Sequence, residues 1–458
     1  MSRWRLLGGR LLGFTVLGLI AWWLFSAGIP VYWGPSVSPE TYRAGQELFV
    51  RDWQPDDPLT QGDGLGPVYN ASSCVECHFQ GGIGGGGDNQ HNVTAFSVVP
   101  TKRDPNPHNG LIHTFARDYT QRETLARVNE IFPIIKGSVT EINGCRYVIP
   151  DFNPVSTQKI NTPALFGIGW IDRISAKAIR HNRDSRILSQ SAREIAGKFK
   201  SVPIGRARML ADGRIGKFGA KAQFATVREF VAAACANELG LGNPLMAQAE
   251  PLGYEPTTAI ARDLSEKQFN QLTQFVQAIP RPREIVPKSA KERTQVELGR
   301  KLFAQIGCAA CHIPNLNGVK GLYSDLLLYR MGLPGNDATY GGSADQNKLL
   351  LVVNPESDEW RTPPLWGVAD SAPYLHDGRA PTLHQAILQH HGDGRKVRDA
   401  YKSLGDNRKA IIAFLKTLRA PAAITPKAPP QNPRSAPSVI QEVKSSDKAG
   451  KSDQGERG

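Results

Sequence analysis

Two motifs of cysteine and histidine are the residues of this chain best suited to chemistry. Both have the pattern Cys-x-x-Cys-His, and their cysteines are Cys74, Cys77, Cys308 and Cys311. Two thiols at this spacing can add to the two vinyl groups of one haem, and the adjacent histidine then lies beneath the iron. Zinc-type or redox Cys-x-x-Cys motifs are the alternative, but both would need an accidental histidine at the same place. We therefore expect two covalently bound c-type haems, with His78 and His312 as the proximal iron ligands.

The segments around the two motifs resemble each other and occur in the same order. The matching residues are 45–49 and 299–303, 162–167 and 362–367, 212–214 and 377–379, and 226–230 and 382–386. The first pair precedes a motif and the other three follow it. Four matches in one order indicate that the core of the chain is two copies of one haem-binding unit.

The two ends of the chain differ from its middle. Residues 11–33 carry no charge and follow three arginines, and they are long enough to cross a bilayer as a helix. We expect residues 1–35 to be a membrane anchor or a cleaved signal peptide, and the length of the apolar stretch favours the anchor. The globular part would then lie on the periplasmic side of a bacterial inner membrane, or in the periplasm after cleavage. Residues 421–458 are rich in Pro, Ala, Ser, Lys and Asp, which predicts a disordered tail.

The charge of the chain bears on its partners. The 458 residues carry a net charge of +13, which could steer an acidic electron-donor protein towards the chain, although ordinary surface charge explains it equally well. No basic run is interleaved with aromatic residues, so we expect no nucleic-acid partner.

Helical patterns dominate the middle of the chain, and sustained strand alternation is scarce. The apolar runs at helical spacing are residues 222–239, 264–279, 291–305 and 407–418. The sequence therefore predicts a mainly α fold of two tandem cytochrome c-like haem domains with long Gly/Pro-rich loops, plus one N-terminal membrane helix. The N-terminal haem domain, with insertions, would span residues 36–283 and the C-terminal haem domain residues 284–420.

Further motifs lie in both halves of the chain. Two of them follow the second haem motif: Arg-Thr-Pro-Pro-Leu-Trp-Gly at residues 361–367 and Pro-Tyr-Leu-His-Asp-Gly-Arg-Ala at residues 373–380. The other three are residues 64–67, 216–222 and 322–328. Over residues 38–420 these motifs resemble the bacterial di-haem cytochrome c peroxidase superfamily, in particular its di-haem oxidoreductase (thiol oxidoreductase-like) branch. The chain departs from that branch at Tyr329, where a histidine usually follows Asp-Leu-Leu-Leu, and at Cys235, where many relatives have phenylalanine.

The resemblance implies that the C-terminal haem receives electrons. Its distal ligand lies one helix beyond the Tyr-Leu-His-Asp-Gly motif in relatives, and counting without gaps places it at His390. Met331 and His391 are the alternatives. The resemblance also implies that His376 lies near the haem. Arg379 could pair with a haem propionate, since a guanidinium matches a carboxylate, or it could be a solvated arginine.

The resemblance implies that the N-terminal haem is the peroxidatic one. His91 follows a glycine-rich run at residues 81–87 and is favoured as its distal ligand, because that histidine lies in a mobile loop in many relatives. His108, His113 and an open position are the alternatives. Splitting an O–O bond also needs a carboxylate or a histidine over the iron. The available carboxylates, among which the sequence does not choose, are Glu130, Glu141 and Glu229.

Four other side chains are candidates for electron transfer or for packing. A tryptophan lies between the haems in several relatives, and the candidates here are Trp170 and Trp366; each could equally be a core aromatic. Cys145 and Cys235 lie outside the haem motifs. They could form a disulfide in an oxidising compartment, or Cys235 could be a buried free thiol.

Alignment of the two repeats favours unequal haems, because Ala234 falls opposite His390 and the first repeat therefore lacks a histidine there. We expect an enzyme that takes electrons singly at the C-terminal haem and reduces hydrogen peroxide at the N-terminal haem, or oxidises a partner protein. Its electron donor would be a small redox protein of the cytochrome or cupredoxin type. The alternative is a membrane-anchored electron-transfer cytochrome with both irons six-coordinate and no substrate; a haem-based sensor is weaker, because no signalling domain is present. A bound calcium ion is left open.

Overall fold

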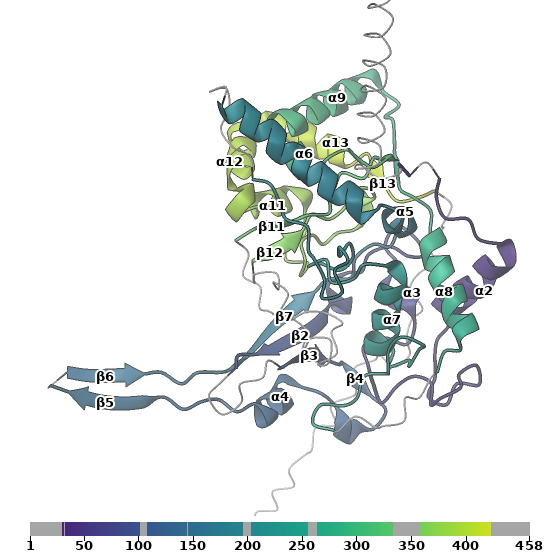
Figure 1. Cartoon of the computed structure of the whole chain (residues 1–458), viewed down its shortest axis with the longest axis vertical. Helices are drawn as coiled ribbons and strands as arrows, with labels where there is room; N and C mark the ends of the chain where they lie inside the picture. Colours follow the sequence, from purple (N-terminus) through teal and green to yellow (C-terminus); the bar gives the residue numbers. More distant parts are fainter. Residues whose placement is uncertain are drawn as a thin grey trace, which may run out of the picture.

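The computed structural model describes most of the chain between its two ends (Figure 1). The described residues are 30–31, 33–100, 108–143, 145–195, 203–254, 263–332 and 358–422. Residues 1–29, which make up most of the predicted membrane segment, and residues 423–458, which make up nearly all of the predicted tail, lie outside these ranges. Within them, no helix combines the length and the apolar character needed to cross a membrane.

Two helix pairs frame the two halves of the molecule (Figure 1). α2 (Pro39–Val50) packs against α8 (Glu266–Ala278), and α9 (Ala290–Gln305) packs against α13 (Arg408–Leu415). The helical runs expected from the sequence coincide with α8, α9, α13 and α7. The remaining helices are α3 (Cys74–Cys77), α4 (Leu125–Ile131), α5 (Ile168–Asp172), α6 (Ala176–Ile195), α7 (Val227–Glu238), α11 (Leu383–Leu388) and α12 (Arg395–Ser403).

A glycine lies at the crossing of each helix pair. A Cβ at Gly45 of α2 would overlap the carbonyl oxygen of Gln271 in α8, and a Cβ at Gly299 of α9 would overlap that of Ala410 in α13. Gly45 and Gly299 occupy equivalent positions in the sequence repeat. The repeat therefore preserves the same close helix contact in both halves.

The prediction of a mainly α fold is wrong, because the described residues contain thirteen strands in six sheets. The largest sheet is antiparallel with the order β3-β2-β7, from β3 (His108–Ile112), β2 (Val93–Val98) and β7 (Val155–Ile160). Its central strand β2 is buried on both faces, so its sequence lacks the polar–apolar alternation by which a strand is recognised. The remaining strands, of two to five residues, are β1 (Val68–Tyr69), β4 (Phe115–Ala116), β5 (Ser138–Ile142), β6 (Cys145–Ile149), β8 (Arg283–Glu284), β9 (Asn315–Leu316), β10 (Val319–Lys320), β11 (Leu328–Arg330), β12 (Glu359–Arg361) and β13 (Leu418–Arg419).

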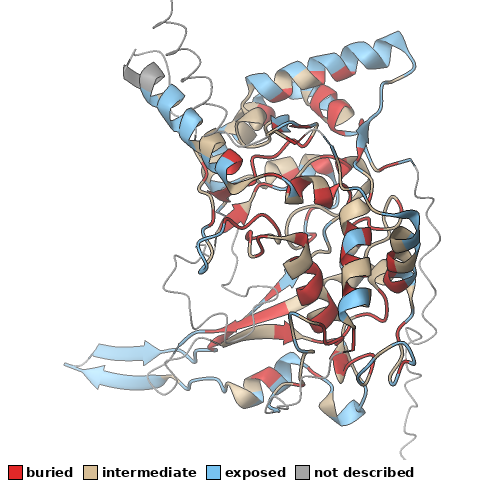
Figure 2. Cartoon of the chain, turned by 45° about the vertical axis from the view of Figure 1, so that its right-hand side comes forward, coloured by how far each residue is buried: buried red, intermediate tan, exposed pale blue. Residues whose placement is uncertain are grey.

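A β-hairpin of β5 and β6 projects away from the body of the molecule, as Figure 1 and Figure 2 both show. Every residue of its two strands is exposed, including the apolar Val139, Tyr147 and Val148. Cys145 begins β6 as an exposed free thiol, whereas Cys235 is a buried free thiol in α7. The two cysteines therefore do not form the disulfide that the sequence left open.

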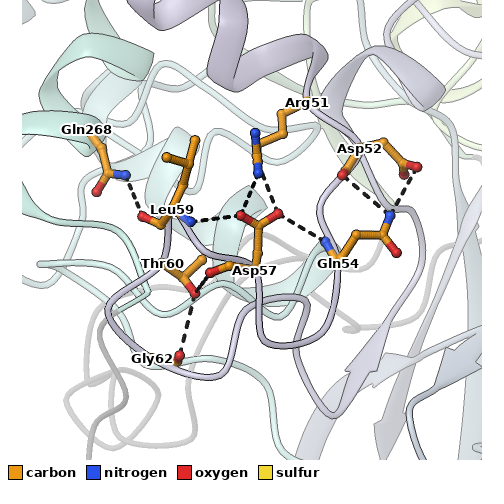
Figure 3. Close-up of polar contacts among 8 residues, drawn as sticks. All are labelled: Arg51, Asp52, Gln54, Asp57, Leu59, Thr60, Gly62 and Gln268. Atoms are coloured by element: carbon orange, nitrogen blue, oxygen red, sulfur yellow. Dashed lines mark hydrogen bonds and ion pairs between the residues drawn. The ribbon is translucent and has the colours of Figure 1, made fainter.

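The loop after α2 is held by one buried carboxylate (Figure 3). Arg51 donates two hydrogen bonds to Asp57, from Nε to Oδ2 at 3.0 Å and from Nη2 to Oδ1 at 2.7 Å. The Leu59 amide donates to Asp57 Oδ1 at 3.0 Å, and Gln268 of α8 donates to the Leu59 carbonyl oxygen at 2.8 Å. This network fixes the chain between α2 and the first haem motif against α8.

Two apolar cores hold the helix pairs together. The first core contains Phe49 of α2 and Phe269 of α8, and the second contains Phe303 of α9 and Phe414 of α13. The first core also includes Trp366 from the second half of the chain. The two halves therefore share apolar packing where they meet.

Candidate functional site

One cavity brings the two Cys-x-x-Cys-His motifs together. It has a volume of about 500 Å³ and is lined by all four motif cysteines and by both motif histidines, His78 and His312. The rest of its wall is largely apolar and comes from both halves, for example from Phe230 of α7 and Leu415 of α13. A mostly apolar cavity that offers two thiols and a histidine from each of two sides fits two haems.

The first motif is positioned by a short helix and a glycine-rich loop. Ser73 caps α3 by accepting a hydrogen bond from the Glu76 amide at 3.3 Å. The chain then turns back, so that His78 Nδ1 donates to the carbonyl oxygen of Gly85 at 3.0 Å. A Cβ at Gly85 would overlap the carbonyl oxygen of Gln80, so the turn needs a glycine there. The glycine-rich run therefore orients the motif histidine.

The second motif repeats this arrangement with other residues. His312 Nδ1 donates to the carbonyl oxygen of Tyr323 at 2.9 Å. Burial lowers the pKa of both His78 and His312 to about 4, so both imidazoles are neutral near pH 7. Because Nδ1 carries the proton in each ring, Nε2 keeps its lone pair for a metal ion.

His390 lines the same cavity and is oriented in the same way. Its Nδ1 donates to the carbonyl oxygen of Ala386 at 2.8 Å, and burial lowers its pKa. Met331 also lines the cavity. His391 is instead partnered by Arg398, with 2.6 Å between His391 Nδ1 and Arg398 Nη1, and it is not among the lining residues. Of the three distal candidates for the second haem, the structure brings His390 and Met331 to the cavity.

The histidines expected over the first haem lie elsewhere. His91 is paired with Asp88, with 2.8 Å between Nδ1 and Oδ1. His113 is buried against Glu123, with 2.8 Å between Nδ1 and Oε2, and His108 begins β3. None of these three histidines lines the cavity.

α7 forms the cavity wall beside the first motif. Ala234 and Cys235 line this wall, and so does Glu238 one turn later. The pKa of the Cys77 thiol is raised well above its usual value, mainly by burial and secondly by the negative charge of Glu238. Glu238 therefore lies close to the motif. Asn70 donates to Glu238 Oε2 at 2.8 Å and fixes the orientation of the carboxylate.

Sequence reasoning did not single out Glu238. Glu130 and Glu141 are exposed, and Glu229 closes the capping box that starts α7. The signal that could have found Glu238 is its spacing. It lies four residues after Ala234, the position aligned with His390, and residues four apart share one face of a helix.

A further wall of the cavity carries buried polar groups. The ring of His376 stacks on Trp360 with 3.5 Å between centroids and 9° between planes, and both His376 Nε2 and Trp360 Nε1 are buried without a hydrogen-bond partner. Arg361 donates to the carbonyl oxygen of Gly219 at 2.9 Å, and Lys221 Nζ lies 4.3 Å from the centre of the Trp360 ring. Buried cations and an orphaned imidazole nitrogen fit the carboxylates of a bound group, as haem propionates would be.

Arg379 and Trp170 lie outside this cavity. Arg379 pairs with Asp377 in the second repeat as Arg214 pairs with Asp212 in the first, so the repeated Asp-Gly-Arg motif forms a turn closed by its own ion pair. The Arg281 guanidinium lies 4.7 Å from the centre of the Trp170 ring.

The second tryptophan candidate, Trp366, does line the cavity. A Cβ at Gly167 would lie 2.9 Å from Trp366 Cζ2, so a glycine of the first half receives this ring from the second half. Trp366 therefore packs where the two halves of the chain meet.

Comparison with known families and proteins agrees with these features. Residues 153–418 match the family model described as "Di-haem oxidoreductase, putative peroxidase", which is more than half of the chain. The curated protein "Methylamine utilization protein MauG" of Methylorubrum extorquens is 32% identical over 137 residues, which are 28% of this chain and 35% of that protein. The chain thus spans about a third of the length of this curated relative.

Two solved structures are among those that the structural comparison found. The di-haem peroxidase BthA from Burkholderia thailandensis is 16% identical, with a TM-score of 0.38 over 86% of this chain and 91% of that chain. A MauG-like protein associated with microbial copper homeostasis is 15% identical, with a TM-score of 0.36 over 85% of this chain and 94% of that chain.

Proposed function

The chain belongs to the di-haem oxidoreductase family, and on that premise we propose that its two haem sites have different tasks. Electrons enter one at a time at the second motif, and hydrogen peroxide is reduced at the first. The observation that carries the proposal is the difference between two equivalent cavity walls. His390 faces the cavity after α11, whereas α7 presents Ala234 and Glu238.

The haems would be attached as thioethers through the four motif cysteines, with His78 and His312 as proximal ligands. This is supported by the Nδ1 atoms of both rings, which are each anchored to a backbone carbonyl, and by the thiols that line the cavity. Lys221, Arg361 and His376 would hold propionate groups. A bound haem supplies an iron that can exchange single electrons and bind a peroxide.

At the second motif the protein supplies two oriented, neutral imidazoles. His312 and His390 both anchor Nδ1 to a backbone carbonyl, and burial lowers the pKa of both rings. Binding of a haem iron by both rings would leave no position for a substrate, so this site would pass electrons only.

At the first motif the protein supplies space and a proton carrier. Reduction of one hydrogen peroxide to two waters consumes two electrons and two protons. Glu238 would carry a proton from one oxygen of the peroxide to the other as the O–O bond breaks. Asn70 holds the carboxylate in place, and the small side chain of Ala234 leaves space at the cavity wall beside the first motif.

The electron donor and the cellular location are also part of the proposed function. The electron donor would be a small redox protein of the cytochrome or cupredoxin type, supported by the net charge of +13, which attracts an acidic partner. We propose that the protein lies on the periplasmic side of a bacterial inner membrane, or in the periplasm if its N-terminal segment is cleaved, because c-type haems are attached there.

Low-temperature electron paramagnetic resonance tests the division of tasks. The purified protein would be measured fully oxidised and half-reduced, with and without hydrogen peroxide. We expect a high-spin ferric signal that peroxide consumes and a second, low-spin signal. Two low-spin signals that peroxide leaves unchanged in both states would overturn the proposal and indicate an electron carrier.

A matched pair of variants tests the role of Glu238. Glu238→Gln keeps the shape of the side chain but removes the proton carrier, and we expect it to slow peroxide reduction by about 10²- to 10⁴-fold. Glu130→Gln changes an exposed carboxylate outside the cavity and should leave the rate unchanged. Equal rates for the two variants would remove Glu238 from the mechanism.

A further inference from the structure

A buried tyrosine beside the second motif has a chemical arrangement that the proposed function does not use. Tyr329 Oη donates to Asp325 Oδ2 at 2.7 Å, and Arg186 of α6 donates to the same oxygen at 2.8 Å. Tyr329 is 2% exposed, Asp325 is fully buried, and the Tyr329 ring lines the cavity. The Asp325 amide donates to the Cys311 carbonyl oxygen at 3.1 Å, so the group is fixed directly to the haem motif.

The surroundings of Tyr329 keep water away from its hydroxyl group. Tyr329 lies in β11 and is paired across the ladder with Trp360 of β12. On another side, a Cβ at Gly205 would lie 2.6 Å from Tyr329 Cε2 and 2.7 Å from Leu327 Cβ. The glycine therefore allows the chain around residue 205 to close over the tyrosine, whose hydroxyl group donates to Asp325.

Neighbouring aromatic side chains lack such an acceptor. Trp360 Nε1 is buried without a hydrogen-bond partner, so its proton has no acceptor. Tyr374 also lines the cavity, but its hydroxyl donates to the carbonyl oxygen of Val368 at 3.1 Å, and a peptide carbonyl cannot hold a proton. Burial raises the pKa of Asp325, which makes its carboxylate a better proton acceptor.

We propose that Tyr329 is a redox-active side chain that stores one oxidising equivalent for the haem sites, with Asp325 as its proton acceptor. The phenol gives one electron to a one-electron oxidant, the peroxide-oxidised haem pair. Its O–H bond breaks as the proton crosses the 2.7 Å hydrogen bond to Asp325 Oδ2. Reduction reverses both transfers: an electron from a reductant returns to the tyrosine, and the proton returns from Asp325 to Oη.

The group of Tyr329, Asp325 and Arg186 reaches from the cavity to the protein surface. Arg186, which closes the group, has a side chain that is 21% exposed on α6. An oxidising equivalent on Tyr329 thus lies one side chain from the protein surface, where a reductant too large for the cavity can approach. The inference rests on the proposed peroxide reduction, because that reaction supplies the oxidant.

Rapid freeze-quench electron paramagnetic resonance of the holoprotein, mixed with hydrogen peroxide, tests the inference. We expect a tyrosyl radical whose hyperfine pattern changes when tyrosine is supplied with a deuterated ring. Tyr329→Phe should abolish this signal, and Tyr374→Phe, which alters a tyrosine of the same cavity without a proton acceptor, should leave it in place. A radical that persists in Tyr329→Phe, or its absence from the unmodified protein while peroxide is consumed, would overturn the inference.

Two additions separate this inference from the proposed function. Peroxide consumption is measured on the same samples. If the protein does not consume peroxide, photogenerated tris(bipyridine)ruthenium(III) replaces peroxide as the one-electron oxidant. The absorption of the tyrosine phenoxyl radical is then followed in the same variants. If Tyr329→Phe does not fold, Asp325→Asn and a comparison of radical formation in H₂O and D₂O take its place. A radical that forms equally fast in both solvents, and equally well in Asp325→Asn, would exclude Asp325 as the proton acceptor.

Discussion

The buried contact between His113 and Glu123 offers a test of how the first haem site is supported. Glu123 accepts hydrogen bonds from the His113 amide at 2.7 Å, from His113 Nδ1 at 2.8 Å and from the Leu252 amide at 2.8 Å. His113 Nε2 donates to the carbonyl oxygen of Asn237 at 2.9 Å, next to Glu238 at the end of α7. Both side chains are almost completely buried, so water cannot replace a lost partner.

Glu123→Gln keeps the shape of the side chain and so creates no cavity. It removes the negative charge and turns one of two acceptor oxygens into a donor. Either the Leu252 amide or the two His113 donors must then face an NH₂ group. A buried donor left unsatisfied costs about 1–3 kcal/mol, and the remaining bonds lose their charge assistance. We expect the free energy of unfolding to fall by about 3 kcal/mol.

Urea unfolding of the holoprotein, followed by far-ultraviolet circular dichroism, measures this loss. Glu130→Gln is the matched control, because Glu130 lies nearby in α4 but forms an exposed ion pair with Arg127 that contributes at most about 1 kcal/mol. The rate of peroxide reduction should also fall in Glu123→Gln, since the end of α7 carries Glu238. A loss of stability no larger than that of the control would refute this account of the first site.

Three further predictions concern stability and thiol chemistry. Burial raises the pKa of Asp263 to about 6, so the folded state holds this proton more tightly than the unfolded state does. The free energy of unfolding should therefore fall as pH rises from about 4 to about 6. A pH series of urea titrations measures this slope, and Asp263→Asn should remove it. Gly299→Ala should lower the free energy of unfolding by about 1–3 kcal/mol, because its Cβ would overlap α13, and an unchanged urea midpoint would contradict this. A thiol reagent should modify exposed Cys145 in the native holoprotein and buried Cys235 only in denaturant. Thioether attachment predicts two reactive thiols per denatured chain, and six reactive thiols would disprove it.

The fold was predictable where its signals are local. α8 and α9 follow clear apolar stripes and begin at serine caps, Ser265 and Ser289, so the sequence alone finds them. The sheet β3-β2-β7 was missed because Val93–Val98 is buried on both faces and because burial does not alternate along β7. These strands exist because of partners far along the chain, and local propensity does not report such partners.

The candidate site divides in the same way. The motif cysteines and histidines are recognisable because haem attachment requires them within five consecutive residues. Trp360 and Arg361 meet the motifs only through the packing of distant segments, so no spacing near the motifs indicates them. Glu238 is indicated only by its position four residues after Ala234 in the alignment of the repeats. Arg379 was a candidate because the guanidinium suits a carboxylate, but its own Asp377 is two residues away and occupies it.

The asymmetry of the two sites arises where two equivalent helices end. α7 and α11 both begin at a threonine cap, Thr226 and Thr382, which accepts the amide three residues later. α7 then continues through a run of alanines, the best helix formers, for twelve residues and delivers Glu238 to the cavity.

α11 stops after six residues, so His390 lies in the turn beyond it. That turn is fixed by Gly392, which has a positive φ of 48° and whose Cβ would overlap the carbonyl oxygen of Arg330 in β11. A difference in helix length, set by alanines in one repeat and by a glycine turn in the other, therefore places a carboxylate at one motif and an imidazole at the other. Under the proposed function, the two sites therefore differ because of where their helices end, and not because of the motif that both share.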